Sequence, residues 1–187
     1  MSFSRNHAAV SIVTATYNYG RYLAETIESV LAQTFPHWEM IVVDDGSTDE
    51  TPQVIERYQT DSRIRYHVGQ RQGPAGARHT GVRLAQSPIV AFLDADDLWA
   101  PTKLERQLPL FDNPDVGVVY SRRLLMGPAG EPLAMRQPQL YRGEVLEHLF
   151  ADNFICFSTV LARRALIESV GGFGDVPLAV DYDLLLR

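Results

Sequence analysis

Cysteine is almost absent from this sequence: Cys156 is the single one in 187 residues. A disulfide within the chain is therefore excluded. Residues 154–157, Phe-Ile-Cys-Phe, surround the thiol with apolar side chains, a pattern typical of a buried structural cysteine rather than a reactive one. A chain without disulfides suits a reducing compartment, so we expect a cytoplasmic protein.

Long apolar runs and excess basic charge are also missing. No stretch approaches the roughly 20 apolar residues that cross a bilayer, and residues 1–7 lack the apolar core of a signal peptide. The 17 Lys and Arg residues are outnumbered by 23 Asp and Glu residues, which gives a net charge of -6. Proteins that bind nucleic-acid phosphates usually carry a basic face, so we expect no nucleic-acid partner. Peripheral attachment to the inner face of a membrane stays compatible with this composition.

Apolar runs alternate with helical patterns in the first part of the sequence. The pattern predicts strands at 10–15, 40–43, 64–68, 89–93 and 116–120, and helices at 21–33, 74–85 and 101–111. A further helix is expected after residues 47–50, which match a capping box, with Pro52 in its first turn. Strands that are apolar throughout are buried on both faces. We therefore predict an α/β fold with a Rossmann-like, mostly parallel sheet and helices on both faces.

The second part of the sequence is less regular. Glycines and prolines within 126–139 predict a loop or an irregular hairpin, followed by a helix at 142–151, a strand at 158–162 and a helix at 165–170. We predict one domain over 1–187, with a nucleotide-binding part at about 8–121 and an acceptor-side part at about 122–187. Apolar residues still accumulate at 184–186, so we expect the natural protein to continue, with this chain as its N-terminal catalytic portion.

An acidic run, Asp94-Ala95-Asp96-Asp97, follows the apolar stretch 89–93 directly. Three carboxylates in four residues repel one another, so a folded protein keeps them in water or beside a cation. Hard divalent ions prefer carboxylate oxygens and commonly bridge them to phosphates. The run therefore fits either a solvated acidic turn or a metal-assisted site for a phosphorylated ligand.

Two other polar segments follow predicted strands: residues 16–18 (Thr-Tyr-Asn) follow the first, and residues 44–47 (Asp-Asp-Gly-Ser) follow the second. Open parallel sheets bind ligands beyond the carboxyl ends of their strands, where the strand order switches. If the first strand lies between the second and the fourth, the two acidic clusters stand two strand spacings apart, about 10 Å. That separation suits a nucleoside at one cluster and its metal-bound diphosphate at the other.

Glycine-rich phosphate cradles are missing as well. The loop at 16–20 has one glycine and no G-x-G-x-x-G pattern, and the sequence has no G-K-[ST] element. Another group must therefore neutralise the phosphate charge, and a metal ion at the second acidic cluster would supply it. We expect that ion to be Mn²⁺ or Mg²⁺.

Taken in order, these segments resemble a family 2 inverting glycosyltransferase of the GT-A fold. The resemblance rests on VSIV (10–13), TYN (16–18), QTF (33–35), IVVDDGSTD (41–49), GAR (76–78) and FLDADD (92–97), with later landmarks GGF (171–173) and DYDL (181–184). It implies an enzyme that moves a sugar from a nucleotide-diphospho-sugar, of the UDP or dTDP type, to an acceptor hydroxyl. The acceptor it implies is a carbohydrate or a glycolipid, in polysaccharide or glycolipid synthesis.

The resemblance also implies roles at the nucleotide end of the site. Asp45 would accept a hydrogen bond from the base, with Asp44 beside it. Tyr17 would pack on the base or the ribose, with Thr16 in the same loop. Arg78 would contact the diphosphate or the base, although a structural salt bridge explains it equally well.

At the other end, Asp96 would ligate the metal ion on the diphosphate. Asp94, with its neighbour Ala95, would contact the ribose or metal-bound water, and Asp97 would share the metal or the ribose. Asp181 matches the family's general base, which deprotonates the acceptor hydroxyl on the face opposite the leaving nucleotide. Family members often carry Glu before that aspartate, where this chain has Val180. Asp181 is therefore the sole candidate of the pair.

Two alternative functions stay open from the sequence. A non-catalytic module that binds a nucleotide-sugar would use the same carboxylates without the general base. A Mg²⁺-dependent phosphatase would use a D-x-D nucleophile, but that pair normally follows the first strand, whereas here it follows the fourth.

Overall fold

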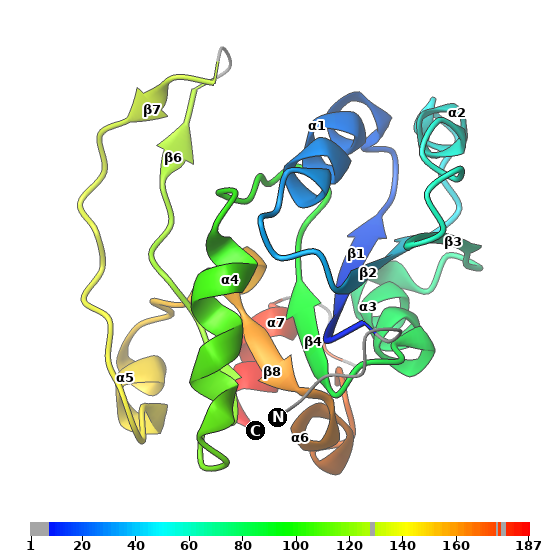
Figure 1. Cartoon of the computed structure of the whole chain (residues 1–187). Helices are drawn as coiled ribbons and strands as arrows, with labels where there is room; N and C mark the ends of the chain where they lie inside the picture. Colours follow the sequence, from blue (N-terminus) through cyan, green and yellow to red (C-terminus); the bar gives the residue numbers. More distant parts are fainter. Residues whose placement is uncertain (1–7, 128–129, 175, 177–178) are drawn as a thin grey trace.

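The computed structural model describes residues 8–127, 130–174, 176 and 179–187. The prediction that residues 1–7 are not a signal peptide concerns a segment outside the described residues. Figure 1 shows the sheet with helices packed around it. The strands of the main sheet are β1 (Val10–Thr16), β2 (Trp38–Asp44), β3 (Ile64–Val68), β4 (Ile89–Phe92), β5 (Val118–Val119) and β8 (Leu161–Arg163). A separate hairpin is formed by β6 (Leu125–Met126) and β7 (Pro132–Leu133).

The main sheet has the strand order β3-β2-β1-β4-β8-β5. Strands β1 to β4 are parallel to one another, whereas β8 runs antiparallel to both β4 and β5. The first strand therefore lies between the second and the fourth, as the predicted ligand site requires. The order switches direction at β1, so the loops after β1, β2 and β4 meet at one edge of the sheet. The predicted α/β fold with a mostly parallel sheet is confirmed.

Helices cover both faces of the sheet. The two apolar cores on either side of the strands contain buried residues of α1, α2 and α4 on one face and of α3, α5, α6 and α7 on the other. The helices are α1 (Gly20–Leu31), α2 (Thr51–Glu56), α3 (Gly73–Leu84), α4 (Lys103–Gln107), α5 (Leu146–Ala151), α6 (Arg164–Ser169) and α7 (Val180–Leu186). Leu23, Ile27 and Val30 recur at helical spacing on α1 and are fully buried, so burial of this stripe fixes the helix on the sheet.

One glycine fixes how closely α3 packs on the sheet. A Cβ atom at Gly81 would lie 2.3 Å from Cγ1 of Val13 in β1, a distance that no side chain tolerates. The glycine therefore lets the helix backbone approach the strand. Because α3 begins at Gly73, the same approach brings the first turns of α3 to the carboxyl edge of β1.

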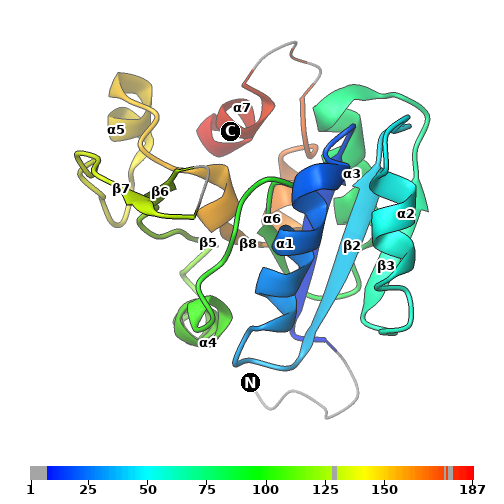
Figure 2. The same cartoon turned by 90° about the horizontal axis from the view of Figure 1, so that it is seen from above.

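The second part of the chain departs from several predicted boundaries. The expected helix at 142–151 begins at Leu146, and the expected strand at 158–162 is a 3₁₀ turn, η2 (Phe157–Thr159), followed by β8. The helix expected at 101–111 is α4 followed by a 3₁₀ segment, η1 (Leu108–Asp112), because Pro109 interrupts the α-helical ladder. The irregular hairpin predicted in 126–139 is present as β6 and β7, which lie on the side of the molecule away from β3 in two perpendicular views (Figures 1 and 2).

The predicted capping box is wrong. Helix α2 has Glu50 at its N-cap with no side-chain cap bond, because Ser47 is used elsewhere. The Ser47 hydroxyl accepts a hydrogen bond from the Asn18 amide, and Asp49 instead accepts the Thr51 amide at 3.0 Å. Pro52 does lie in the first turn of α2, as predicted.

None of the helices in the described part of the chain has the length and apolar character that crossing a membrane requires.

Candidate active site

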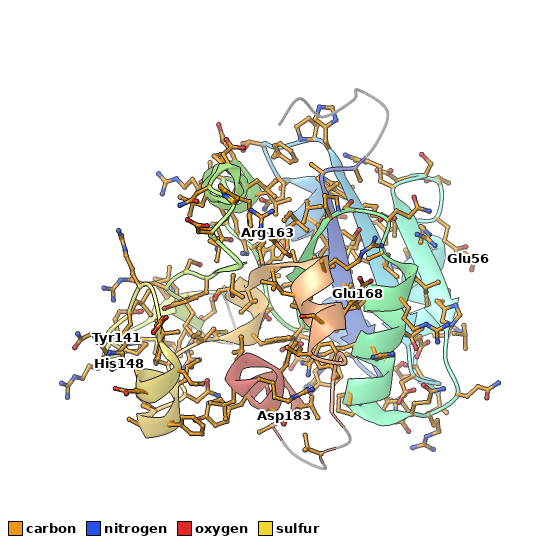
Figure 3. The ribbon with its side chains drawn as sticks, turned by 90° about the horizontal axis from the view of Figure 1, so that it is seen from below. Glu56, Tyr141, His148, Arg163, Glu168 and Asp183 are labelled. Atoms are coloured by element: carbon orange, nitrogen blue, oxygen red, sulfur yellow. The ribbon has the colours of Figure 1, made fainter. Side chains whose placement is uncertain are left out.

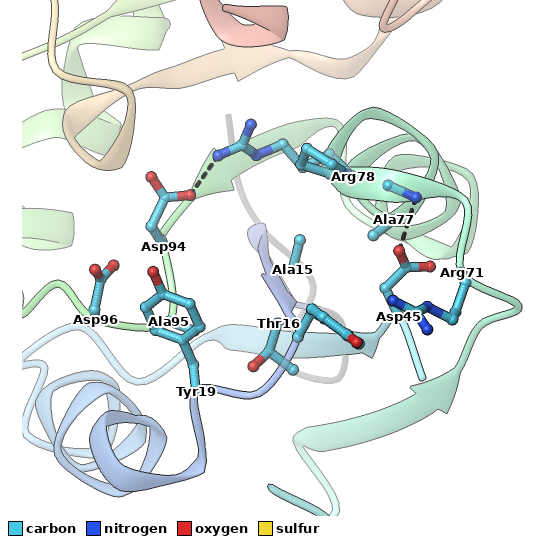
Figure 4. Close-up of a pocket in the computed structure, with 13 residues that line it drawn as sticks. Ala15, Thr16, Tyr19, Asp45, Arg71, Ala77, Arg78, Asp94, Ala95 and Asp96 are labelled. Carbon is cyan, nitrogen blue, oxygen red and sulfur yellow. Dashed lines mark hydrogen bonds and ion pairs between the residues drawn. The ribbon is translucent and has the colours of Figure 1, made fainter. Parts of the chain in front are cut away.

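A cavity of about 660 Å³ opens at the carboxyl edge of the parallel strands. Its wall combines the loops after β1, β3 and β4 with Asp45 after β2 and the start of α3. The lining residues are Ala15, Thr16, Tyr17, Tyr19, Asp45, Arg71, Gly73, Pro74, Ala77, Arg78, Asp94, Ala95 and Asp96. Seven of the ten predicted site residues therefore meet around one cavity, while Asp44, Asp97 and Asp181 lie outside its wall. Figure 4 shows Asp45 and Arg71 at one side of the cavity and Asp94 and Asp96 at the other.

Backbone amides fix the loop after β1 to the loop after β2. Asn18 adopts a positive φ of 57°, and its side-chain oxygen accepts hydrogen bonds from the amides of Thr48 at 2.8 Å and Asp49 at 3.3 Å. Asp49 in turn accepts the Gly20 amide at 3.0 Å. A short polar side chain tolerates this left-handed conformation better than most residues do. Together with the bond from the Asp45 amide to the Thr16 carbonyl at 2.9 Å, these bonds fix the loops that carry Tyr17 and Asp45 relative to each other.

Asp45 is buried, and both of its carboxylate oxygens face backbone donors. The amides of Gln72 and Gly73 each donate to one oxygen at 2.7 Å. These two bonds orient the carboxylate and connect the loop after β2 to the start of α3. Each oxygen keeps a further lone pair with which to accept a hydrogen bond from a ligand.

Asp44 is 1% exposed and lies beneath the site rather than in its wall. Its two oxygens accept hydrogen bonds from the Ser47 amide at 2.8 Å and from the Tyr66 hydroxyl at 2.5 Å. Burial, and then the hydrogen bond to Asp44, raise the pKa of Tyr66. The geometry gives Asp44 the role of a support for the loop that carries Asp45.

Asp94 and Arg78 form an ion pair across the cavity, with 2.6 Å between Arg78 Nη2 and Asp94 Oδ1. The Arg78 guanidinium also lies over the Phe157 ring, 5.0 Å from its centroid. The Asp94 amide donates to the Ser158 hydroxyl at 3.0 Å, which ties the acidic loop to η2. The salt bridge that the sequence left open for Arg78 is therefore present, and the pair lines the cavity.

Asp96 lies at the cavity with no compensating cation among the described residues. Desolvation, and then the negative charges of Asp97 and Asp94, raise the pKa of the Asp96 carboxyl. Asp97 lies outside the wall, where its charge acts on the Cys156 thiol and, after burial of that thiol, raises the Cys156 pKa. Ala95 holds the turn in place because its carbonyl accepts the Thr26 hydroxyl at 2.9 Å.

No cluster of three or more His, Cys, Asp or Glu side chains that could hold a metal ion occurs among the described residues. Mg²⁺ and Mn²⁺ in phosphate sites do not need such a cluster, since one or two carboxylates combine with phosphate oxygens and water. Asp96, whose carboxylate lines the cavity, would supply one such carboxylate. The donor set therefore fits an ion that binds together with a phosphorylated ligand rather than alone.

The acidic loop rests on the aromatic and amide side chains behind it. The Trp99 ring nitrogen donates to the Ser158 carbonyl at 2.7 Å, and the Gln33 side-chain amide donates to the Ala100 carbonyl at 2.9 Å. Lys103 lies over the Trp99 ring and is largely removed from water, which lowers its pKa to about 7. Trp99 is therefore a support of the loop and does not line the cavity.

Asp181 lies in the first turn of α7, after Ala179, which has a positive φ of 54°. Its side chain is half-buried, and it has no hydrogen-bond or ion-pair partner within the described ranges. Its neighbour Asp183, which is labelled in Figure 3, pairs with Arg187 at 2.7 Å, and this ion pair stabilises the end of the helix. Asp181 and Asp183 thus differ: Asp183 forms an ion pair with Arg187, whereas Asp181 forms none among the described residues.

The sequence prediction missed Arg71 and Tyr19, which also line the cavity. Arg71 lies in the loop after β3, and its guanidinium carbon is 4.8 Å from the centre of the Tyr17 ring. A usable signal existed, because the loop after the third parallel strand ends at the same edge as the others. Tyr19 was part of the polar loop after β1, but no pattern separated it from an ordinary surface residue.

Comparison with known proteins places this chain in a family. The family model described as Glycosyl transferase family 2 matches residues 11–171. A protein of Nostoc sp. named as an uncharacterized glycosyltransferase is 37% identical over 169 residues, which cover 86% of this chain and 52% of that protein. An Escherichia coli protein, named UDP-Glc:alpha-D-GlcNAc-diphosphoundecaprenol beta-1,3-glucosyltransferase, is 31% identical over 167 residues, or 86% of this chain and 63% of that protein.

The fold agrees with a solved structure of a mannosyltransferase from Pyrobaculum calidifontis in complex with GDP-Man and Mn²⁺. The TM-score is 0.72 at 26% identity, and the match covers 96% of this chain and 51% of the other. The predicted GT-A type of fold is therefore confirmed. The chain spans about half the length of the curated relatives it matches.

Proposed function

This chain belongs to glycosyltransferase family 2, and from that premise we propose that its cavity holds a nucleotide-diphospho-sugar of the UDP or dTDP type. The sugar is transferred to an acceptor hydroxyl with inversion. The observation that carries the proposal is that Asp45, Asp94 and Asp96 line one cavity of about 660 Å³ at the switch point of the sheet. That volume lies within the range of small-molecule sites, about 300–1,000 Å³.

The nucleoside occupies the end of the cavity at Asp45. The Asp45 carboxylate, already oriented by two backbone amides, accepts a hydrogen bond from an N–H of the base. The Tyr17 ring packs against the base or the ribose. The Thr16 hydroxyl supports this placement, because it is buried in the wall without a hydrogen-bond partner among the described residues. A ligand group that bonds it would remove the cost of an unsatisfied buried hydroxyl.

The diphosphate lies at the end with Asp94 and Asp96. Its negative charges would be repelled by these carboxylates, so a divalent cation, Mn²⁺ or Mg²⁺, binds with it. Asp96 is the ligand that reaches the cavity, and Asp97 is the second ligand in this proposal. When bound, the ion stabilises the negative charge on the departing diphosphate. Arg78 keeps Asp94 oriented toward the ribose and the water around the ion.

Asp181 is the general base in this proposal. Inversion requires a single base on the face of the sugar opposite the leaving nucleotide. Asp181 is the carboxylate of α7 that no protein cation neutralises in the described residues, since Arg187 pairs with Asp183. The acceptor is a carbohydrate or a glycolipid, in polysaccharide or glycolipid synthesis at the inner face of a membrane. The E. coli relative is named for a diphosphoundecaprenol-linked acceptor, which supports this class.

A thermal-shift screen tests donor and metal together. UDP-glucose, UDP-N-acetylglucosamine, a dTDP-sugar and GDP-mannose are each added with Mn²⁺, and again with EDTA. We expect a UDP- or dTDP-sugar to raise the unfolding temperature in Mn²⁺ and to lose that effect in EDTA. Inorganic phosphate with Mn²⁺ is the control and should have no effect. Stabilisation that is equal in EDTA would contradict the metal-dependent part of the proposal.

Asp181→Asn tests the reaction separately from binding. The variant should bind the donor as the wild type does and should transfer no sugar to a polyprenyl-diphospho-sugar acceptor. Full transfer by the variant would remove Asp181 from the base role. Donor binding by the wild type with neither transfer nor donor hydrolysis would instead indicate a nucleotide-sugar-binding module.

A further inference from the structure

We propose that the hairpin of β6 and β7 binds the surface of an anionic lipid bilayer, with its exposed apolar side chains among the lipid headgroups and its arginines at the lipid phosphates. The hairpin comprises β6, β7 and their flanking residues, 122–127 and 130–137 in the described part of the chain. The inference rests on the proposed function in one respect, a membrane-linked acceptor. It does not involve the nucleotide cavity, because none of these described residues lines its wall.

The hairpin exposes large apolar side chains on both of its faces. Leu124, directly before β6, is 77% exposed, and three side chains within the strands are also exposed: Leu125, Met126 and Leu133. Leu125 and Leu133 are paired across the strands and the adjacent pair contains Met126, so the two pairs point to opposite faces. None of these side chains belongs to either apolar core of the described residues. Exposed apolar surface of this kind marks a site that contacts a protein or a membrane.

Hydrogen bonds between its two arms hold the hairpin together. The Gly127 amide donates to the Glu131 carbonyl at 2.8 Å. The Gln137 side-chain amide donates to the Arg123 carbonyl at 2.9 Å, at the other end of the hairpin. In two perpendicular views the hairpin lies on the side of the molecule away from β3 (Figures 1 and 2). It is therefore a formed element that presents its side chains to the surroundings.

Arginines accompany the apolar side chains. Between residues 122 and 137 there are three arginines, Arg122, Arg123 and Arg136, and a single acidic residue, in a chain whose net charge is -6. None of the three arginines forms an ion pair with a carboxylate among the described residues. Arg123 contacts the Cys156 thiol, and Arg122 donates to the Pro138 carbonyl at 3.5 Å. Arg122 and Arg136 therefore keep guanidinium donors for lipid phosphates.

The backbone limits how deep the hairpin enters the bilayer. Each strand of this two-stranded sheet has one edge with unpaired amides and carbonyls, and such groups are costly in hydrocarbon. The hairpin therefore stays at the level of the headgroups, where water reaches its backbone and the arginine stems extend to the phosphates. The acidic residues of the rest of the chain do not prevent this contact, because salt screens exposed charges over about 8–10 Å.

A lipid surface fits the hairpin better than a second copy of the chain does. Stable protein interfaces use about 20–30 residues on each side. The two arms of the hairpin contain six and eight described residues. A protein partner would cover one face, whereas lipid headgroups surround both. The arginines also complement the charge of anionic lipids.

Sedimentation with vesicles in EDTA tests the hairpin without nucleotide or metal ion. The vesicles are made of phosphatidylcholine alone, or of phosphatidylcholine and phosphatidylglycerol in equal parts. We expect the wild type to bind the mixed vesicles about 25-fold more tightly, because each of two arginines contributes about fivefold at an anionic surface.

The apolar contacts are tested by Leu124→Gln combined with Leu133→Gln. This double variant should bind the mixed vesicles about 100-fold more weakly, at about tenfold for each leucine that no longer leaves water. Leu110→Gln is the matched control, because Leu110 is 53% exposed in η1, outside the hairpin. It should bind as the wild type does. The unfolding temperature without vesicles shows that each variant is folded.

The charged contacts are tested by Arg122→Gln combined with Arg136→Gln. This variant should bind the mixed vesicles about 25-fold more weakly and should lose the preference over phosphatidylcholine. Arg57→Gln, at an exposed position that follows α2, is the matched control and should keep the preference.

Four results would overturn the proposal. They are no binding of the wild type to mixed vesicles, equal binding to both kinds of vesicle, equal losses in the hairpin variants and their controls, and a wild-type dimer that the leucine variant loses. The last result would assign the hairpin to a second copy of the chain. The thermal shift with nucleotide-sugars uses no vesicles, so it tests the proposed function separately. Vesicle binding by a protein that no nucleotide-sugar stabilises would overturn the proposed function alone.

Discussion

The two edges of the parallel sheet both carry acidic side chains, but the edges differ in how many protein partners these carboxylates have. At the amino edge, Glu39 in β2 is 6% exposed, and its carboxylate accepts hydrogen bonds from three donors. The Ser11 hydroxyl donates at 2.6 Å, the Gln86 amide at 2.8 Å and the Arg65 guanidinium at 3.0 Å. Arg65 also donates to the Leu84 carbonyl, so it joins β3 to the end of α3. The protein itself satisfies this carboxylate.

At the carboxyl edge, the protein does not supply a full set of partners for the acidic side chains. Asp94 has one cationic partner, Arg78, and Asp96 has none among the described residues. We interpret the difference as follows: a buried charge with a full set of partners stabilises the fold, whereas a charge at a cavity without them is the one that we propose for ligand binding. The predictions below test whether stability and ligand binding separate along this line.

The largest effect is expected at the amino edge. Glu39→Ala should lower the free energy of unfolding by about 3 kcal/mol, because it leaves the Ser11, Gln86 and Arg65 donors without their acceptor. Urea denaturation measures the loss, and Glu25→Ala, at an exposed position, is the matched control. UDP affinity in Mn²⁺ should not change in the folded variant. A loss below about 1 kcal/mol would show that this network does not stabilise the fold.

Asp96→Ala should have the reverse effect of Glu39→Ala: it should lower UDP affinity and leave stability intact. Loss of the carboxylate removes a ligand of the metal ion, so Mn²⁺-dependent UDP affinity should fall by about 100-fold, or about 2.7 kcal/mol. Thermal stability without ligand should not fall, because the change relieves repulsion from Asp94 and Asp97. Calorimetry with UDP and Mn²⁺ measures the loss, and Asp115→Asn removes an exposed charge elsewhere as a control. Unchanged affinity would remove Asp96 from the site.

The nucleotide-binding part of the fold was largely predictable because its signals are local. Buried strands such as β2 are apolar along their length, and the stripe of Leu23, Ile27 and Val30 marks α1. The side chains at strand ends then follow from topology, which is why Thr16, Asp45 and Asp96 were placed at one site.

The rest depended on tertiary contacts that leave no local pattern. Ser47 forms no capping box because the Asn18 amide takes its hydroxyl, 29 residues away in sequence. Topology indicates that the loop after β3 reaches the site, but the φ of Arg71 and its contact with Tyr17 cannot be derived from residue type. The rings of Tyr141 and His148, the latter in α5, stack with 3.6 Å between their centroids (Figure 3). No periodic pattern in the sequence indicates this contact either.

A smaller effect, on the pH dependence of stability, is expected from Lys103 near the carboxyl edge. Burial lowers its pKa to about 7, whereas the unfolded chain keeps the ordinary value of 10.5. Between these values the unfolded chain binds more protons, so the free energy of unfolding should rise with pH. The rise, up to about 1 kcal/mol per pH unit, is measured between pH 7 and 9. Above that range the raised pKa values of Cys156 and Tyr66 give a change of opposite sign.

Lys103→Met should lose this rise, because the titrating group is gone. Its Nζ donates to the Thr159 carbonyl at 3.0 Å and to Gln107, and not to the acidic run. UDP affinity in Mn²⁺ should therefore stay the same in the variant. An equal pH slope in wild type and variant would show that Lys103 stays charged in the fold.

The smallest effect is expected for Asp49. This carboxylate also lies at the carboxyl edge, but its hydrogen-bond partners are complete. Burial opposes ionisation, but hydrogen bonds from Thr51 and from the Gly20 amide outweigh it and lower the pKa of Asp49 below 3.8. The stabilisation is therefore present above pH 3.8 and lost as the pH falls through the lower folded value. Asp49→Ala should cost about 1 kcal/mol at pH 7, because it removes the hydrogen bonds to Thr51 and to the Gly20 amide. Urea denaturation should show this difference shrinking below pH 3.8; a difference that persists there would mean that Asp49 acts through packing and not through its charge.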